Sequence, residues 1–200
     1  VSFEPEKSID RSILQKMNDT IRHRGPDDEG YYQDARASLG MRRLSIIDLF
    51  TGHQPISNEN EDIWVIYNGE IYNFQPVRAE LEARGHRFKT RTDTEIIVHA
   101  YEEYGDDCVR HFNGMFAIAL WDARRCKLLL ARDHMGIKPL YYWAGPDRLV
   151  FGSELKALTA HPDVPRRVNL SAIDLFLSLE YIPSPLTIYE DVFKLPPGHL

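Results

Sequence analysis

Long apolar runs are missing from this sequence. No run approaches the roughly 20 residues that a helix needs to cross a bilayer, so we expect no contact with a membrane. A basic stripe is missing as well. The formal net charge of −6 therefore argues against nucleic acid as a partner.

Cysteine is also scarce, because the chain has only Cys108 and Cys126. Two cysteines argue against a disulfide scaffold and fit the reducing cytoplasm, where we expect the protein to be located. Neither a Cys-x-x-Cys nor a paired-histidine motif occurs, so we expect no metal site. The 200 residues, 43% of them hydrophobic and 27% charged, are typical of one globular domain, alone or with a connector.

The most informative stretch covers residues 62–72. Its apolar run at 63–67 is β-branched or aromatic and predicts a buried strand, which Asn68, Gly69 and Glu70 follow. Asn-Gly between two strand-like runs is a strong hairpin signal. Alternatively, a strand end here presents an amide, a backbone N–H and a carboxylate together, and this trio can bind a small polar ligand and stabilise an oxyanion.

Two charged segments each allow two interpretations. Arg42 and Arg43 interrupt an apolar stretch at residues 37–48 that predicts one or two strands. Either both arginines lie on a solvent edge, or one binds a carboxylate through its bidentate fork. The charged loop at 22–30 is either solvated or forms a salt-bridged lip of a site.

Helical spacing of apolar residues predicts four helices, each with a candidate N-cap. In the third helix, Thr92 and Glu95 form a predicted capping box, which would leave Asp93 in the first turn beside the helix dipole. The other three predicted helices are residues 8–22 capped by Ser8, residues 74–84 capped by Asn73, and residues 171–179 capped by Ser171.

Short strands dominate residues 113–154 and their brief connections predict an antiparallel meander. The predicted strands are 115–121, 127–131, 139–143 and 148–151. Strands at both ends with helices between them indicate two antiparallel sheets packed together, with helices outside. Dense proline after about residue 160 indicates a connector.

Eight short blocks, taken together and in this order, resemble a known family. They are RHRGPD at 22–27, RLSIID at 43–48, YNGEIYN at 67–73, TDTE at 92–95, GMFA at 114–117, RDHMGIKPLYY at 132–142, SELKAL at 153–158 and LPPGH at 195–199. They resemble the N-terminal class II glutamine amidotransferase domain of glutamine-dependent asparagine synthetase.

The resemblance implies an α+β fold of the N-terminal-nucleophile hydrolase type, a four-layer α/β/β/α sandwich of two antiparallel sheets. Residues 1–158 would form the amidotransferase domain with a truncated start, and residues 159–200 a connector toward an ATP-dependent synthetase domain. The implied ligand is L-glutamine. We expect no cofactor in this domain, ATP and Mg in the synthetase domain, and leave a homodimer open.

The resemblance also assigns roles to five residues. Arg43 would clamp the α-carboxylate of glutamine, whereas Asp93 and Glu70 would bind its ammonium group. Asn68 and Gly69 would donate to the tetrahedral oxyanion that forms when the amide is hydrolysed. The implied function is release of ammonia from glutamine, for amidation of an ATP-activated aspartate on the C-terminal domain.

The family's nucleophile, an N-terminal cysteine, is not in this sequence. Block spacing puts its expected place about six residues before Val1. Cys108 and Cys126 lie mid-chain without a free amine, so the 200 residues alone are expected to be inactive. Two alternatives stay open: a glutaminase domain with another acceptor (amino sugars, purine precursors or surface polysaccharide), and a non-catalytic glutamine-binding pseudo-domain.

Overall fold

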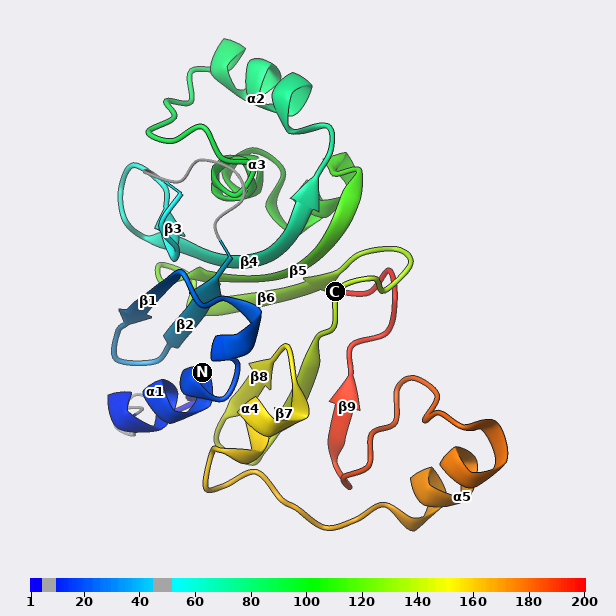
Figure 1. Ribbon diagram of the computed structural model, residues 1–200. Helices are drawn as coiled ribbons and strands as arrows, with labels where there is room; N and C mark the ends of the chain where they lie inside the picture. The colour runs from blue at the N-terminus through cyan, green and yellow to red at the C-terminus, as the bar shows by residue number, and fades with distance from the viewer. Residues whose placement is uncertain (5–9, 45–51) are drawn as a thin grey trace.

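Antiparallel sheets organise the chain in the computed structural model, which describes residues 1–4, 10–44 and 52–200 (Figure 1). Within these residues there are three sheets, with strand orders β1-β2, β3-β4-β5-β6 and β8-β7-β9. The strands are β1 Asp28–Gln33, β2 Ser38–Arg43, β3 Ile56–Ser57, β4 Ile63–Ile71, β5 Gly114–Asp122, β6 Lys127–Arg132, β7 Tyr141–Ala144, β8 Leu149–Gly152 and β9 Val192–Lys194.

Helices surround these sheets. α3 lies directly over one face of the four-stranded sheet and α2 lies further out (Figure 1). The helices are α1 Arg11–Asp19, α2 Phe74–Ala83, α3 Glu95–Tyr104, α4 Leu155–Thr159 and α5 Leu170–Leu179, with short 3₁₀ turns at Arg22–Arg24 and Gly105–His111. None of the helices within the described ranges is long and apolar enough to span a bilayer.

The core follows the alternation of β4. Val65, Tyr67 and Ile71 are buried in the main hydrophobic cluster, together with residues of α3 and β5. Trp64 and Ile66 point to the opposite face and pack there against the β1–β2 hairpin, where Tyr32 stacks on Trp64 with ring centroids 4.5 Å apart. β4 is therefore covered on both sides, as a buried strand requires.

The hairpin interpretation of Asn68-Gly69 is wrong. β4 runs without interruption from Ile63 to Ile71, and Asn68 and Gly69 pair with Ala117 and Phe116 of β5. β5 offers a partner to every residue of β4, and this long-range pairing overrides the local turn preference of Asn-Gly.

The predicted single meander is also wrong. β5 and β6 pair in one sheet, but β7 pairs with β8 and β9 in another. Through β9, the segment predicted as a connector contributes a strand to the β7 sheet. The boundary at residue 158 stays a prediction, as does the four-layer sandwich.

Three predicted caps need correction. Glu95 does not close a capping box with Thr92, because its carboxylate accepts from the backbone N–H groups of Lys89 and Thr90, at 2.7 and 2.6 Å. Asn73 precedes α2 but its side chain bonds the backbone of His111 and Asn113 instead of the helix. A long-range contact therefore takes the Asn73 side chain, and a local contact with the preceding loop takes that of Glu95.

The third correction concerns α5, which is capped by Asn169, whose side chain accepts from the Ala172 N–H, and not by Ser171. The first helix begins only at Arg11, with Asp10 as its cap. The predicted cap Ser8 lies outside the described residues.

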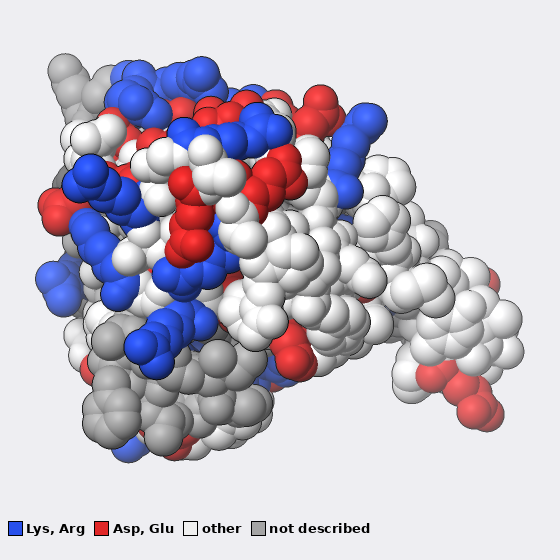
Figure 2. Space-filling view, turned by 90° about the horizontal axis from the view of Figure 1, so that it is seen from above, with Lys and Arg blue, Asp and Glu red and all other residues white. Residues whose placement is uncertain are grey.

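Charge is unevenly distributed over the surface. Seen from the α2 side, Lys, Arg, Asp and Glu gather over the body of the molecule, whereas the projecting arm that carries α5 has few (Figures 1 and 2). Large apolar side chains are exposed on and just after α5: Leu170, Phe176, Leu177, Leu179 and Tyr181.

Candidate functional site

All five predicted site residues line one cavity of about 410 Å³. Arg43 reaches this cavity from the end of β2. Three residues, Asn68, Gly69 and Glu70, reach it from β4, and Asp93 reaches it from the segment just before α3. Up to 50 positions of sequence separate these residues, so their convergence is a property of the tertiary structure. The cavity combines a guanidinium, two carboxylates and an amide, which suits a ligand with both an acidic and a basic end.

Asp93 is bound across to β4 and does not cap a helix. It is only 5% exposed, and its Oδ2 accepts from the Tyr67 hydroxyl at 2.8 Å and from the Ile71 N–H at 3.0 Å. Both contacts use the same oxygen. Burial and the neighbouring negative charge of Asp93 raise the pKa of Tyr67, so Tyr67 stays a proton donor to Asp93.

The Gly69 N–H points to the open edge of β4. The N–H groups of alternate residues along a strand point to the same edge, and on this edge the Tyr67 N–H donates to Gln54 Oε1 at 2.7 Å and the Ile71 N–H donates to Asp93. β3 pairs with β4 only at Trp64 and Val65, so it stops short of Gly69. The Gly69 N–H therefore lies at the cavity wall, between the Tyr67 N–H, which the Gln54 side chain binds, and the Ile71 N–H, which the Asp93 side chain binds.

Gly69 also allows the close pairing of β4 with β5. A Cβ at this position would lie 2.2 Å from the Met115 carbonyl oxygen, a distance that no side chain tolerates. Next to it, the Asn68 side-chain amide forms no hydrogen bond with any residue that the structure describes. The amide and the glycine thus stand side by side at the cavity, as the oxyanion interpretation requires.

The two successive arginines of β2 have different environments. Arg42 forms ion pairs with Asp19 and with Glu29, the latter at 2.7 Å, and its side chain is only 10% exposed. Arg43 extends toward Gly52 and Thr92, where a Cβ on Gly52 would lie 2.4 Å from its terminal nitrogen. Neither arginine fits the solvent-edge interpretation, and Arg43 is the one whose side chain reaches toward Thr92 at the cavity.

The charged loop after α1 forms a salt-bridged lip. Glu154 accepts from His23 at 2.9 Å and from Arg24 at 3.2 Å, and Lys156 lies 3.2 Å from its other oxygen. Partial burial opposes the charge of Glu154, but these hydrogen bonds hold its pKa below the usual value. Arg24 also lines the cavity, so this lip belongs to the site.

Sequence reasoning gave no site role to several polar residues that line this cavity, among them Gln54, Tyr67 and Lys138. Gln54 is buried and holds both the N–H and the carbonyl of Tyr67, so it replaces a strand partner beside Gly69. Tyr67 orients Asp93. The sequence offered a signal for Tyr67, which begins the YNGEIYN block, whereas the burial of Gln54 is visible only in the structure.

The two cysteines lie away from this cavity and are both free thiols. Cys108 is fully buried, and burial raises its pKa to about 12, which leaves too little thiolate for nucleophilic attack. Cys126 is exposed in the turn between β5 and β6. This agrees with the expectation that neither thiol replaces an N-terminal nucleophile.

Fold and site together define the class of the domain: antiparallel sheets whose central strand brings an amide and a glycine N–H to a cavity lined by an arginine and an aspartate. The chain belongs to the glutamine amidotransferase domain family, whose model matches residues 2–200. Its similarity extends to particular enzymes, the glutamine-hydrolysing asparagine synthetases.

Three such relatives illustrate this. Asparagine synthetase 3 of Bacillus subtilis is 38% identical over 100% of this chain and 33% of its own length. Asparagine synthetase 2 of the same organism is 48% identical over 94% of this chain and 25% of its own. A putative asparagine synthetase 2 of Methanocaldococcus jannaschii is 37% identical over 94% of this chain and 40% of its own length. This chain thus spans well under half the length of these relatives.

Two solved structures share the fold. One is the glutamine phosphoribosylpyrophosphate amidotransferase of B. subtilis complexed with ADP and GMP, with a TM-score of 0.51 and 23% identity. The other is described as the allosteric regulatory enzyme of purine biosynthesis, with a TM-score of 0.52 and 20% identity. In each case the match covers 62% of this chain and 29% of the chain in the solved structure. At this identity they support the fold alone.

Proposed function

We propose that this chain is the glutaminase domain of a glutamine-hydrolysing asparagine synthetase, and that it releases ammonia from L-glutamine. The observation that carries the proposal is the convergence of Arg43, Asn68, Gly69, Glu70 and Asp93 on one cavity. Glutamine has an α-carboxylate, an α-ammonium and a side-chain amide, and this cavity offers a partner for each.

Each residue has a role that its geometry supports. Arg43 binds the α-carboxylate through its planar fork. Asp93 binds the ammonium through Oδ1, because Oδ2 is already occupied by Tyr67 and Ile71. Glu70 adds a second negative charge at the same end. The Asn68 amide and the Gly69 N–H stabilise the oxyanion, and each such donor typically contributes about 3 kcal/mol at the transition state.

The nucleophile in this proposal is an N-terminal cysteine that precedes Val1 in the mature protein. Val1 and Asn68 line a second, mostly apolar cavity of about 110 Å³, which adjoins the site at Tyr67, Asn68 and Ser153. That Val1 and Asn68 line the same cavity supports a segment before Val1 that extends toward Asn68. The cysteine thiolate would attack the amide carbon, its own α-amine would pass a proton to the nitrogen that leaves as ammonia, and water would then hydrolyse the thioester to glutamate and free thiol.

Ammonia would then be used by a C-terminal synthetase domain, where we place ATP and Mg. The exposed apolar side chains of α5, such as Phe176 and Leu177, support a protein partner at this arm. The proposal also includes the four-layer sandwich as the architecture of the complete domain, and a cytoplasmic location, which the two free thiols support.

The first test is glutamine binding by the complete protein. Arg43→Ala removes the partner of the carboxylate, and the lost charge-assisted hydrogen bonds should raise the Kd for glutamine about 10- to 100-fold by calorimetry. Arg84→Ala, an exposed arginine on the α2 side, is the matched control. An unchanged Kd in Arg43→Ala would show that the cavity binds something else.

The second test separates catalysis from binding. Asn68→Ala in the complete enzyme should lower kcat for glutamine hydrolysis about 100- to 1000-fold with little change in KM, because an oxyanion donor acts only in the transition state. Asn113→Ala, exposed at the start of β5, is the control. A change confined to KM would contradict the oxyanion role, and a complete protein without glutaminase activity would favour the pseudo-domain.

A further inference from the structure

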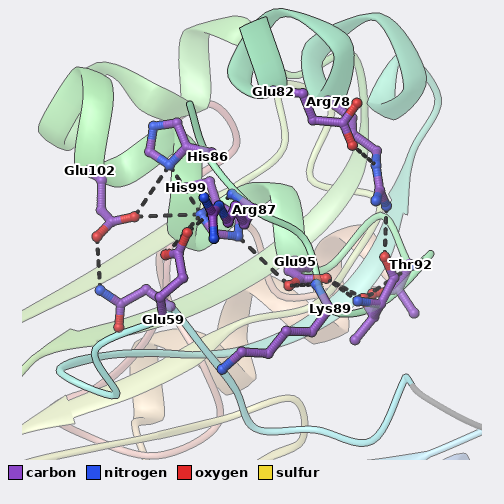
Figure 3. A network of polar contacts seen from close by, with 12 residues as sticks. Glu59, Arg78, Glu82, His86, Arg87, Lys89, Thr92, Glu95, His99 and Glu102 are labelled. Atoms are coloured by element: carbon purple, nitrogen blue, oxygen red, sulfur yellow. Dashed lines mark hydrogen bonds and ion pairs between the residues drawn. The ribbon is translucent and has the colours of Figure 1, made fainter. Parts of the chain in front are cut away.

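A second cluster of ionisable side chains lies away from the glutamine cavity. It consists of Glu59 in the turn between β3 and β4, His86 just after α2, and His99 and Glu102 on α3. One nitrogen or oxygen from each of the four lies within 4.8 Å of all the others. Figure 3 shows these side chains turned toward one another.

The spacing of these atoms matches a tetrahedral metal site. Zinc bound at about 2.0–2.2 Å holds neighbouring ligand atoms about 3.3–3.6 Å apart. In the structure, His86 Nδ1 lies 3.2 Å from His99 Nδ1 and 3.6 Å from Glu102 Oε2. His99 Nδ1 lies 3.5 Å from Glu102 Oε2 and 3.6 Å from Glu59 Oε2.

The ring nitrogens of His86 and His99 that point away from the cluster face carboxylates, as is common for histidines that bind metal ions. His86 turns Nδ1 to the centre and Nε2 to Glu103, at 3.1 Å. His99 turns Nε2 toward Glu95, at an ion-pair distance of 3.7 Å that is too long for a hydrogen bond. A carboxylate on the far ring nitrogen is the common arrangement around zinc-bound histidine, because it fixes the tautomer and the ring orientation.

The two carboxylates are held in a comparable way. Glu59 Oε1 accepts from the Arg87 N–H at 3.1 Å, and Glu102 Oε1 accepts from Asn58 Nδ2 at 2.8 Å. Each carboxylate therefore has its outer oxygen fixed by a hydrogen bond. The inner oxygen Oε2 of Glu102 faces both Nδ1 atoms, and that of Glu59 faces Nδ1 of His99. All four inner atoms are preorganised before any ion binds.

A shared proton explains the close approach of these four side chains less well than a divalent cation does. A proton on His99 Nδ1 can donate to only one of its three neighbours. His99 is 1% exposed, and its Nε2 has no hydrogen-bond partner among the described residues. A divalent cation attracts all four inner atoms at once.

We propose that Glu59, His86, His99 and Glu102 bind one Zn²⁺ or a similar first-row divalent cation. Four protein ligands leave no open position, so the site is structural and not catalytic. The ion would cross-link the β3–β4 turn, the segment after α2, and α3, the helix that directly follows Asp93. This departs from the expectation of no metal, which rested on Cys and His spacing along the chain.

The site can be tested on the complete protein after it has been stripped with a chelator and dialysed. After Zn²⁺ is added back, elemental analysis should find one more equivalent of Zn²⁺ per chain in the wild type than in the variants His86→Gln and Glu59→Gln. Each variant should lose at least about tenfold in affinity, since even outer-shell changes cost that much. These residues are chosen because they are less buried than His99, with side chains 12% and 35% exposed.

Controls and spectroscopy complete the test. His111→Gln and Glu82→Gln remove one histidine and one glutamate outside the cluster, and should bind Zn²⁺ as the wild type does. Zn²⁺ should raise the Tm of the wild type and of the controls but not of the two cluster variants, and Co²⁺ should give the visible absorption of a tetrahedral centre. Equal stoichiometry and equal Tm shifts in wild type and cluster variants would overturn the proposal.

Discussion

Two buried aspartates of this domain are used in different ways. Asp93 and Asp133 are 5% and 1% exposed. Both oxygens of Asp133 are saturated, since Oδ1 accepts from the N–H groups of Met135 and Ile137, and Oδ2 from those of Phe116 and Lys138. Asp93 accepts two hydrogen bonds, and both end on Oδ2.

The difference separates a structural carboxylate from a binding one. Asp133 holds the loop after β6 against β5 and thereby positions Lys138 at the cavity proposed to bind glutamine. Asp93 is anchored through one oxygen and lines the cavity itself. Both aspartates are buried, so what distinguishes the proposed ligand-binding residue is the oxygen that the fold leaves unused, Oδ1 of Asp93.

The largest expected effect is on stability at Asp133. Asp133→Asn replaces one oxygen by an NH₂ group that faces two backbone N–H donors, and each unsatisfied buried donor costs about 1–3 kcal/mol. We expect the free energy of unfolding to fall by at least about 3 kcal/mol, measured by urea titration. A loss below about 1 kcal/mol would contradict the structural assignment.

The same substitution at Asp93 should behave in the opposite way. In Asp93→Asn the amide oxygen can keep both contacts of Oδ2 while the NH₂ group faces the cavity. Stability should change by less than about 1 kcal/mol, but the Kd for glutamine should rise about 10- to 100-fold because the ammonium loses a charged partner. Asp174→Asn on α5 controls for the lost charge; unchanged affinity in Asp93→Asn would remove Asp93 from the site.

The smallest effect is the pH dependence that Asp133 contributes. Burial raises the pKa of its carboxyl, but four backbone hydrogen bonds outweigh this and hold the pKa below the usual 3.8. Because the folded pKa is lower, Asp133 stabilises the fold above about pH 3.8, and this contribution is lost as the pH falls through the folded pKa. Urea titrations from pH 7 to 3 should show a shallower decline in Asp133→Asn; parallel curves would contradict this.

Much of the fold was accessible from local patterns. The apolar run at 63–67 correctly predicted β4, and apolar spacing correctly predicted helices that match α2, α3 and α5 to within a few residues at their ends. The caps of these helices were wrong: Asn73 bonds the distant backbone of His111, Glu95 bonds the loop just before its own helix, and Asn169 caps α5. Local preference cannot include a competitor that only the folded chain brings near.

The site shows the same division. The five residues were named from motif blocks, yet their chemistry depended on facts that no block contains. The alternation of β2 turns the two side chains apart, so that Arg42 pairs with Asp19 and Glu29 while Arg43 extends toward Gly52 and Thr92. Likewise, β3 pairs with β4 only at Trp64 and Val65, so the Gly69 N–H lies on an edge of β4 without a strand partner.

By itself, the sequence determined the buried strand, the helices and the residue types that a glutamine site needs, because hydrophobic periodicity and short motifs are local properties. Only the tertiary structure decided that Asn68-Gly69 continues a strand, that Asp93 turns away from its helix, and that Glu59, His86 and His99 meet. These outcomes depend on which distant segments pack together. Such packing is set by the free energy of the whole core and not by any one stretch of chain.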